Sequence, residues 1–224
     1  MGYLLKTDWW KWLCVAILVY TVIGGLLFPV PRLNILNETI RVLHFHVPMW
    51  FGMILLFLSS VIHAIKYLKS GNVDSDVYSS QLAIVGLAFG ILGILSGMVW
   101  AKFAWGEFWS NDPKQNGAAI SLLVYLAYFV LRGSFQDEQQ RNRISAVYNI
   151  FAFAMMIPLL FILPRMTDSL HPGNGGNPAL SIYDTDSNLK KVFYVAVIGW
   201  TLLGFWISTI SIRLTITKQK LEDA

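Results

Sequence analysis

The sequence predicts an all-α fold, a bundle of six transmembrane helices, from three observations. Of the 224 residues, 55% are hydrophobic and only 13% are charged. The mean hydropathy of +0.55 is too high for an ordinary water-soluble domain. Six apolar stretches approach the length of about 20 helical residues that a hydrocarbon core requires. We therefore expect a polytopic membrane protein with a single six-helix membrane domain over residues 1–224.

The six stretches follow one another along the chain with short polar segments between them. They run roughly from Trp12 to Val30, Val47 to Leu68, Leu82 to Ala101, Pro113 to Leu131, Ile144 to Pro164 and Val192 to Ile212. The fourth is the least obvious because its uncharged part begins only at Gln115. Asp112 as N-cap and Pro113 at the first helical position would start that helix early. The first stretch is longer than a signal-peptide core and no cleavage site follows it, so we expect it to be retained.

The distribution of Lys and Arg predicts the orientation in the membrane. An even number of spans puts both termini on the same side. Cytoplasmic termini place ten basic residues inside and seven outside, which favours that orientation in the cytoplasmic (inner) membrane. The outer segments are then 31–45, 102–112 and 165–191, on the periplasmic side. The net charge of +4 suits contact with anionic lipid and does not indicate nucleic-acid binding.

The second outer segment, the loop 102–112, is rich in tryptophan. It contains the run WGEFWSND from Trp105 to Asp112. Indole faces at a membrane surface can hold a large flat ligand that neither water nor lipid accommodates well. Tryptophan is enriched at membrane interfaces whatever the function, but Gly106, Glu107 and Asp112 accompany Trp105 and Trp109 in this short gap.

Two other polar gaps each supply a histidine, His46 in HFHVPMW at the boundary of the first outer segment and His171 in LHPGNGGNP. Haem iron is held by one or two imidazoles, which approach opposite faces of the macrocycle. We expect a helix to begin at Val47 and Pro48, because proline in a first turn loses no hydrogen bond. His46 would then have a rigid base, and His171 would lie on a flexible loop. His44 is two residues from His46 and could serve instead.

Each of these residues also has a simpler interpretation. A single interfacial histidine is more often an ordinary hydrogen-bonding residue than a metal ligand. Haem carries two propionates, whose burial near lipid requires cationic partners. Arg41 lies five residues before His46, and Lys114 lies two after Asp112. Either cation could meet a propionate, and either could equally extend toward lipid headgroups.

Small and polar residues within the apolar stretches indicate helix packing. Gly86, Gly90, Gly93 and Gly97 recur at three or four positions and form one smooth stripe. We expect a neighbouring helix to approach closely there. The polar residues inside the stretches are scattered, and packing explains them: Ser59, Ser60, His63, Ser96 and Ser121.

These residues together resemble a known family. WGEFWSNDPK is similar to the WGxxWxWD motif of the haem-handling proteins of cytochrome c maturation, and RVLHFHVPMW resembles the R-x-x-x-x-HVP-x-x-W segment of their CcmC branch. The resemblance covers essentially the whole chain. The family's last tryptophan before the aspartate is Asn111 here, which removes one indole. The DPK ending is also similar to CcsA and CcmF relatives, which are generally larger and carry additional intramembrane histidines.

The resemblance implies a haem b site at the outer face of the membrane. Its axial ligands would be His46 and His171, its presenting surface Trp105, Gly106, Trp109 and Asp112, and its basic positions Arg41 and Lys114. It further implies delivery of haem to the chaperone CcmE, with the ABC transporter subunits CcmA and CcmB and the small CcmD as neighbours. No nucleotide-binding motif is present, so ATP use would come from a partner. We expect haem binding and transfer rather than enzymatic activity.

Three other functions compete with this interpretation. The first is a CcsA-like cytochrome c synthase, or haem lyase, that works without a separate chaperone. The second is an electron-transfer cytochrome b, which requires paired histidines within the spans, whereas only His63 lies in one. The third is a transporter, which would require polar groups along a path through the bilayer.

Overall fold

The computed structural model describes residues 7–31, 38–171 and 186–222. The described part of the chain is helical and contains no strand: α2 (Trp9–Leu27), η1 (Glu38–Val42), α3 (Leu43–Ser70), α4 (Val73–Trp105), α5 (Pro113–Gly133), α6 (Glu138–Ile157), η2 (Pro158–Ile162), α7 (Leu163–Met166) and α8 (Ser187–Glu222). Six helical segments are long and apolar enough to cross a membrane. The protein is therefore a multi-pass membrane protein, as predicted. The Gly- and Pro-rich stretch expected as a loop after His171 lies outside the described residues.

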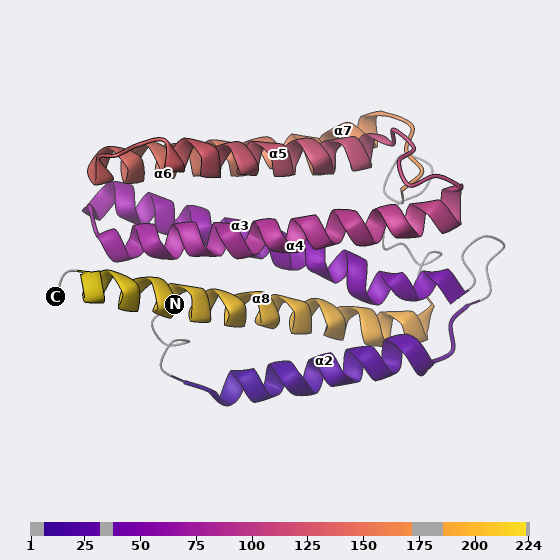
Figure 1. Cartoon of the computed structure of the whole chain (residues 1–224). Coiled ribbons are helices and arrows are strands. Elements are labelled where there is room, and N and C mark those ends of the chain that lie inside the picture. Colours follow the sequence, from indigo (N-terminus) through magenta and orange to yellow (C-terminus); the bar gives the residue numbers. More distant parts are fainter. Residues whose placement is uncertain (1–6, 32–37, 172–185, 223–224) are drawn as a thin grey trace.

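The long helices run side by side with alternating direction (Figure 1). Helices α5 and α6 form one layer, α3 and α4 the middle layer, and α8 with α2 the third. At one end α2 and α4 finish while α3, α5 and α8 begin, and we call this the motif end. The first residues of α2 and the last of α8 lie at the opposite end. The three outer segments of the sequence analysis therefore adjoin the motif end.

The glycine stripe of α4 lies against α3, as the sequence predicts. Gly86 faces the ring of Phe57, and Gly93 faces the indole of Trp50. A Cβ added at Gly93 would lie 2.9 Å from Trp50, closer than real Cβ contacts come. Because these glycines have no side chain, side chains of α3 pack directly on the backbone of α4 and the two helices approach closely.

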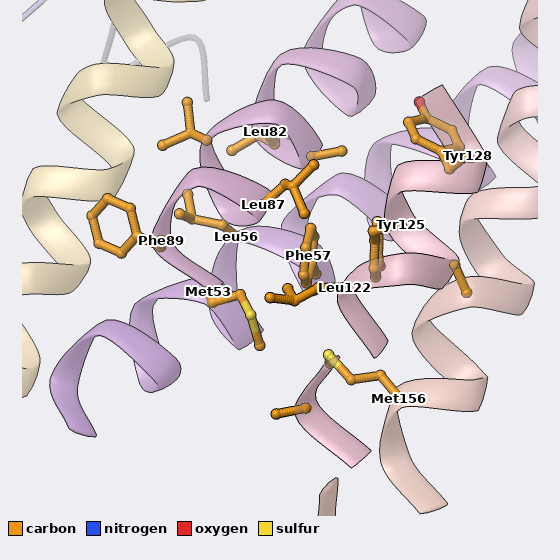
Figure 2. Close-up of a cluster of buried hydrophobic side chains, with 14 of the residues drawn as sticks. Met53, Leu56, Phe57, Leu82, Leu87, Phe89, Leu122, Tyr125, Tyr128 and Met156 are labelled. Atoms are coloured by element: carbon orange, nitrogen blue, oxygen red, sulfur yellow. The ribbon is translucent and has the colours of Figure 1, made fainter. Parts of the chain in front are cut away.

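Apolar side chains of α3, α4, α5 and α6 fill the space beside this seam (Figure 2). The rings of Phe57 on α3 and Tyr125 on α5 stack with their centroids 3.5 Å apart. Met53, Leu122 and Met156 are buried around them. This cluster joins the layer of α5 and α6 to the middle layer of α3 and α4.

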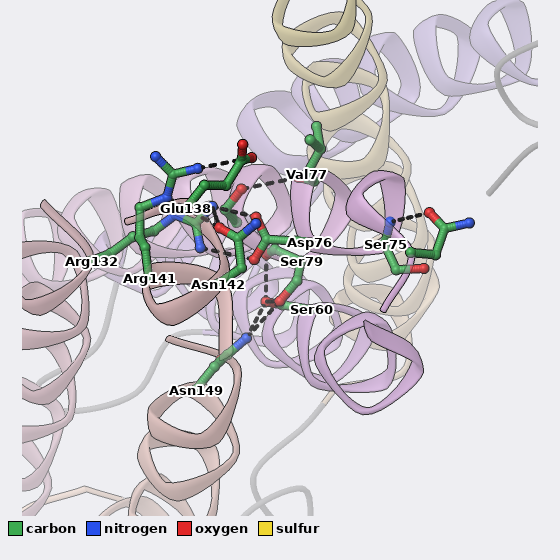
Figure 3. A network of polar contacts seen from close by, with 12 residues as sticks. Ser60, Ser75, Asp76, Val77, Ser79, Arg132, Glu138, Arg141, Asn142 and Asn149 are labelled. Atoms are coloured by element: carbon green, nitrogen blue, oxygen red, sulfur yellow. Dashed lines mark hydrogen bonds and ion pairs between the residues drawn. The ribbon is translucent and has the colours of Figure 1, made fainter. Parts of the chain in front are cut away.

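Polar contacts join the same helices nearer the opposite end (Figure 3). The guanidinium of Arg132 on α5 forms a two-pronged ion pair with the buried carboxylate of Asp76 on α4, with Nη1 2.9 Å from Oδ1. On α6, Asn149 donates to Ser60 of α3 at 2.7 Å and to Ser79 of α4 at 3.0 Å. These bonds fix the relative positions of four helices, because leaving such groups unpaired in the bilayer is costly.

The fifth span is irregular where it approaches the motif end. After α6 the chain passes through the π-helical turn η2, which begins at Pro158, into the short α7. Proline lacks the N–H of a regular helical bond, which explains a change of helix type at this point. Gly117 of α5 packs against the Leu159 carbonyl, where a side chain would have no space. Because η2 packs closely against α5, the residues that follow in α7 lie near the start of α5.

The helix boundaries differ from the predicted spans at several points, and α4, for example, begins at Val73 rather than at Leu82. Helix α3 begins at Leu43 and contains Pro48 in its interior, so the predicted start at Val47 and Pro48 was wrong. The 3₁₀ turn η1 leads directly into α3, and Pro48 is close enough to the start that only one helical bond is lost. Helix α4 continues through Trp105 rather than ending before it. Helix α8 continues to Glu222, beyond the predicted end of the sixth span at Ile212.

We predict that Arg132→Leu lowers the free energy of unfolding by about 3–5 kcal/mol, because it leaves the buried Asp76 carboxylate unpaired. The double variant Asp76→Leu with Arg132→Leu should lose less than the single variant, since no uncompensated charge remains. Denaturant unfolding in detergent measures both values. A double variant at least as destabilised as Arg132→Leu would contradict this account of the ion pair.

Candidate functional site

The carboxylate of Asp112 is the polar centre of the motif end. Asp112 is 4% exposed and caps α5, with Oδ1 accepting from the Lys114 N–H at 2.9 Å. The same oxygen lies 2.8 Å from Nδ1 of His171. Oδ2 accepts from the Ser169 hydroxyl at 2.8 Å and from the Leu170 N–H at 2.6 Å. The predicted cap of α5 is confirmed, and the same side chain holds the segment that follows α7.

These donors determine the charge of Asp112. Burial by itself would raise the pKa of its carboxyl group, but the hydrogen bonds from His171, Leu170 and Ser169 hold the pKa well below its ordinary value of 3.8. The contribution of the carboxylate to stability is therefore present above pH 3.8 and is lost only as the pH falls through the lower folded-state value. Asp112 is an anion at neutral and mildly acidic pH.

His171 lies against a row of indoles. Its ring is edge-on to Trp105, with centroids 4.7 Å apart and planes at 76°. Trp105 is in turn edge-on to Trp100, at 5.3 Å and 71°. Trp100 Nε1 is buried and has no hydrogen-bond partner among the described residues. Sequence reasoning missed Trp100 because it stands outside the motif, inside an apolar stretch.

His46 occupies the first turn of α3 and faces the last third of α4. Its Nδ1 is 3.0 Å from the Ser96 hydroxyl, which also bonds to the Leu92 carbonyl at 2.8 Å. A Cβ on Gly97 would lie 2.6 Å from Cε1 of His46, so this last glycine of the stripe makes room for the imidazole. The ring of Trp50 is edge-on to His46 at 6.2 Å. Sequence reasoning missed the pairing of Ser96 with His46, because 50 residues separate them and no motif joins them.

The two histidines approach α4 at the same end of the bundle. His46 contacts Ser96 and His171 contacts Trp105, which is nine residues further, or about 13 Å along the helix axis. His171 and Lys114 both lie within electrostatic range of His46. The structure therefore brings both predicted ligands, and one of the two predicted cations, into the same region.

The loop between α4 and α5 holds Trp109 beside this region. Gly106 ends α4 with φ of +87°, a left-handed conformation that suits glycine. Trp109 Nε1 donates to Asn116 of α5 at 3.2 Å. Asn111 has φ of +54°, which asparagine tolerates better than tryptophan. The residue that departs from the family motif therefore suits the backbone it occupies.

Arg41 and His44 face the other way, toward α2. Arg41 Nη1 donates to the Gly25 carbonyl at 3.1 Å and to the Phe28 carbonyl at 2.8 Å, and Nε pairs with Glu38 at 2.7 Å. These bonds satisfy carbonyls at the C-terminal end of α2. His44 is 1% exposed and packs against Gly25. His44 is therefore not placed to substitute for His46, which faces α4.

Comparison with known proteins agrees with the motif resemblance. The family model of heme exporter protein C, CcmC, matches residues 3–224. The chain belongs to the CcmC family. It is 25% identical over 192 residues to the heme exporter protein C of Bradyrhizobium diazoefficiens. The aligned residues cover 84% of this chain and 70% of that relative.

CcsA proteins match a shorter part of this CcmC-family chain. The cytochrome c biogenesis protein CcsA of Cuscuta reflexa is 42% identical over 85 residues, which is 38% of this chain and 28% of the relative. CcsA of Synechococcus sp. (strain CC9902) is 40% identical over 86 residues, with the same shares. The CcmC match thus covers nearly the whole chain, whereas the CcsA matches cover less than half of it.

We predict that Asp112→Ala releases the segment 167–171. Hydrogen exchange at the Leu170 amide should become about 10- to 100-fold faster, because a bond to a charged acceptor contributes about 1.5–3 kcal/mol. Exchange mass spectrometry with fragmentation measures the rate. The control is Glu107→Ala, which removes an exposed carboxylate from the same loop. Equal protection of Leu170 in both variants would show that Asp112 does not hold this segment.

Proposed function

We propose that the protein handles haem in cytochrome c biogenesis, binding haem b as cargo at the motif end and passing it to a haem chaperone of the CcmE class. His46 and His171 are the axial ligands in this proposal. The observation that supports it best is the placement of these two imidazoles at one end of the bundle, with a row of indoles beside His171. The site then has the two ligands and the flat apolar surface that a porphyrin needs.

The remaining side chains of the motif end suit the rest of the porphyrin. The presenting surface consists of Trp105, Gly106 and Trp109. The buried N–H of Trp100 is available to donate a hydrogen bond to a haem substituent. Lys114 is close enough to His46 to act on it electrostatically, which suits a propionate partner. Arg41 stays in the proposal as the second cation, although its present bonds are to α2. Asp112 acts through His171 rather than by touching haem.

The different supports of the two ligands suit transfer rather than permanent binding. His46 belongs to a helix that packs closely against α4. His171 belongs to a short segment that makes three hydrogen bonds to one carboxylate, that of Asp112. A partner can displace such a segment without separating the helices of the bundle. We place the motif end on the periplasmic side of the inner membrane and both termini in the cytoplasm.

The expected partners follow from the family. CcmE would receive haem, and CcmA, CcmB and CcmD would form the complex in which transfer occurs. The family name of the CcmC match supports this assignment, and ATP hydrolysis would belong to CcmA.

A CcsA-like cytochrome c synthase is the second candidate, because the CcsA relatives have the higher identity over their matched segment. Reconstitution separates the two functions. The purified protein is supplied with haem and either the chaperone CcmE or an apocytochrome. Transfer to the chaperone supports the first proposal, whereas covalent attachment to the apocytochrome supports the second.

We predict that His46→Ala and His171→Ala each abolish the low-spin haem spectrum of the purified protein and reduce cytochrome c assembly at least about tenfold. The matched control is His63→Ala, because His63 lies further along α3 and packs edge-on against Tyr78 at 5.1 Å. A full and unaltered spectrum in either of the first two variants would remove that histidine from the ligand set.

We also predict that Gly97→Ala weakens haem binding about 10- to 100-fold, since the new methyl group would displace His46. Gly133→Ala is the control, because an added Cβ there meets nothing within 4 Å. Haem titration followed by absorbance measures both affinities. Equal affinities in the two variants would mean that the packing of the His46 ring against Gly97 of α4 does not affect haem binding.

A further inference from the structure

We propose that Ser96 and Asp112 are positioning residues that fix the tautomers of the two histidines, so that both present Nε2 to the iron but with unequal donor strength. This inference rests on the proposed function. It assigns a role to Ser96, which belongs to neither sequence motif, and it gives Asp112 a task distinct from contacting haem.

The hydroxyl of Ser96 has one hydrogen and two acceptor positions. That hydrogen is directed to backbone carbonyls of its own helix, with Leu92 O at 2.8 Å and Gly93 O at 3.0 Å. The oxygen therefore meets His46 Nδ1, at 3.0 Å, as an acceptor. Nδ1 of a neutral His46 must then carry the proton, which leaves the lone pair on Nε2.

The same argument applies to His171 with a stronger acceptor. Both oxygens of Asp112 face backbone N–H groups, Lys114 N at Oδ1 and Leu170 N at Oδ2, and these groups can only donate. Oδ1 therefore accepts from His171 Nδ1 at 2.8 Å as well. The Nδ1 proton is directed to a carboxylate, and Nε2 of His171 is left for the metal.

The two acceptors differ in charge, and this difference reaches the iron. A metal-bound histidine whose other N–H donates to a carboxylate becomes a stronger electron donor than one paired with a neutral group. Stronger donation stabilises ferric over ferrous iron and lowers the reduction potential. Asp112 should therefore set the potential through His171, while Ser96 mainly fixes the orientation of the His46 ring.

Two substitutions separate these effects from loss of structure. Asp112→Asn removes the charge and keeps one oxygen that accepts from Nδ1 and caps α5, but its amide NH2 then faces the Leu170 N–H. Hydrogen exchange at Leu170 in the same variant therefore shows whether the segment that carries His171 stays in place. Ser96→Ala removes the acceptor of His46, and Ser96→Thr restores a hydroxyl. Ser208→Ala is the matched control, because the buried Ser208 makes the same kind of bond to its own helix, to Gly204 O at 2.8 Å.

The experiment measures the absorption spectrum, haem affinity and midpoint potential of the full-length protein loaded with haem. We expect a more positive potential in Asp112→Asn with low-spin haem retained. We expect about tenfold weaker haem binding in Ser96→Ala, restored by Ser96→Thr and absent in Ser208→Ala.

The possible failures are distinguishable. A wild-type protein without a bis-histidine spectrum overturns the proposed function together with this inference. A bis-histidine wild type whose potential is unchanged in Asp112→Asn overturns the carboxylate assignment alone. Unchanged affinity in Ser96→Ala, or an equal loss in Ser208→Ala, overturns the assignment of Ser96.

Discussion

The motif end depends on one buried carboxylate. Asp112 accepts four hydrogen bonds, from the Lys114 N–H at the start of α5, from the Ser169 hydroxyl and the Leu170 N–H, and from the imidazole of His171. A carboxylate that is 4% exposed would be unstable without such donors. The same bonds that satisfy Asp112 therefore fix where the segment after α7 returns to the bundle. The position of His171 is a consequence of that requirement.

Helix α4 supplies the other half of the arrangement. Its glycines allow α3 to approach so closely that His46 reaches Ser96 and lies over Gly97. About one turn beyond Ser96 the same helix carries Trp100, and about two and a half turns beyond Ser96 it carries Trp105. The packing that stabilises the bundle therefore also sets the spacing between the site residues. A change in the α3–α4 seam should act on the site even when the altered residue lies far from it.

The sequence was sufficient for the six spans, the cap of α5 at Asp112 and the motif residues at one end, because each depends on local composition or spacing. It misplaced the start of α3, since proline is favoured in a first turn and predicted a start there, whereas the helix begins at Leu43 directly after η1 and keeps Pro48 inside. It also treated Ser96 as packing. A serine within a helix reveals a partner only when the opposing helix is in place, and that register is set by tertiary contacts.

The asymmetry between the two histidines bears on the direction of transfer. Moving His46 requires separating α3 from α4, whose contact includes Phe57 packed on Gly86 and Trp50 packed on Gly93. Among the contacts of the described residues, moving His171 breaks its ring contact with Trp105 and the bonds to Asp112, each of which contributes about 1.5–3 kcal/mol. In the proposed function the His171 side of the porphyrin is therefore the side that opens. A ligand from the receiving chaperone would then replace His171 on the iron before His46 dissociates from it.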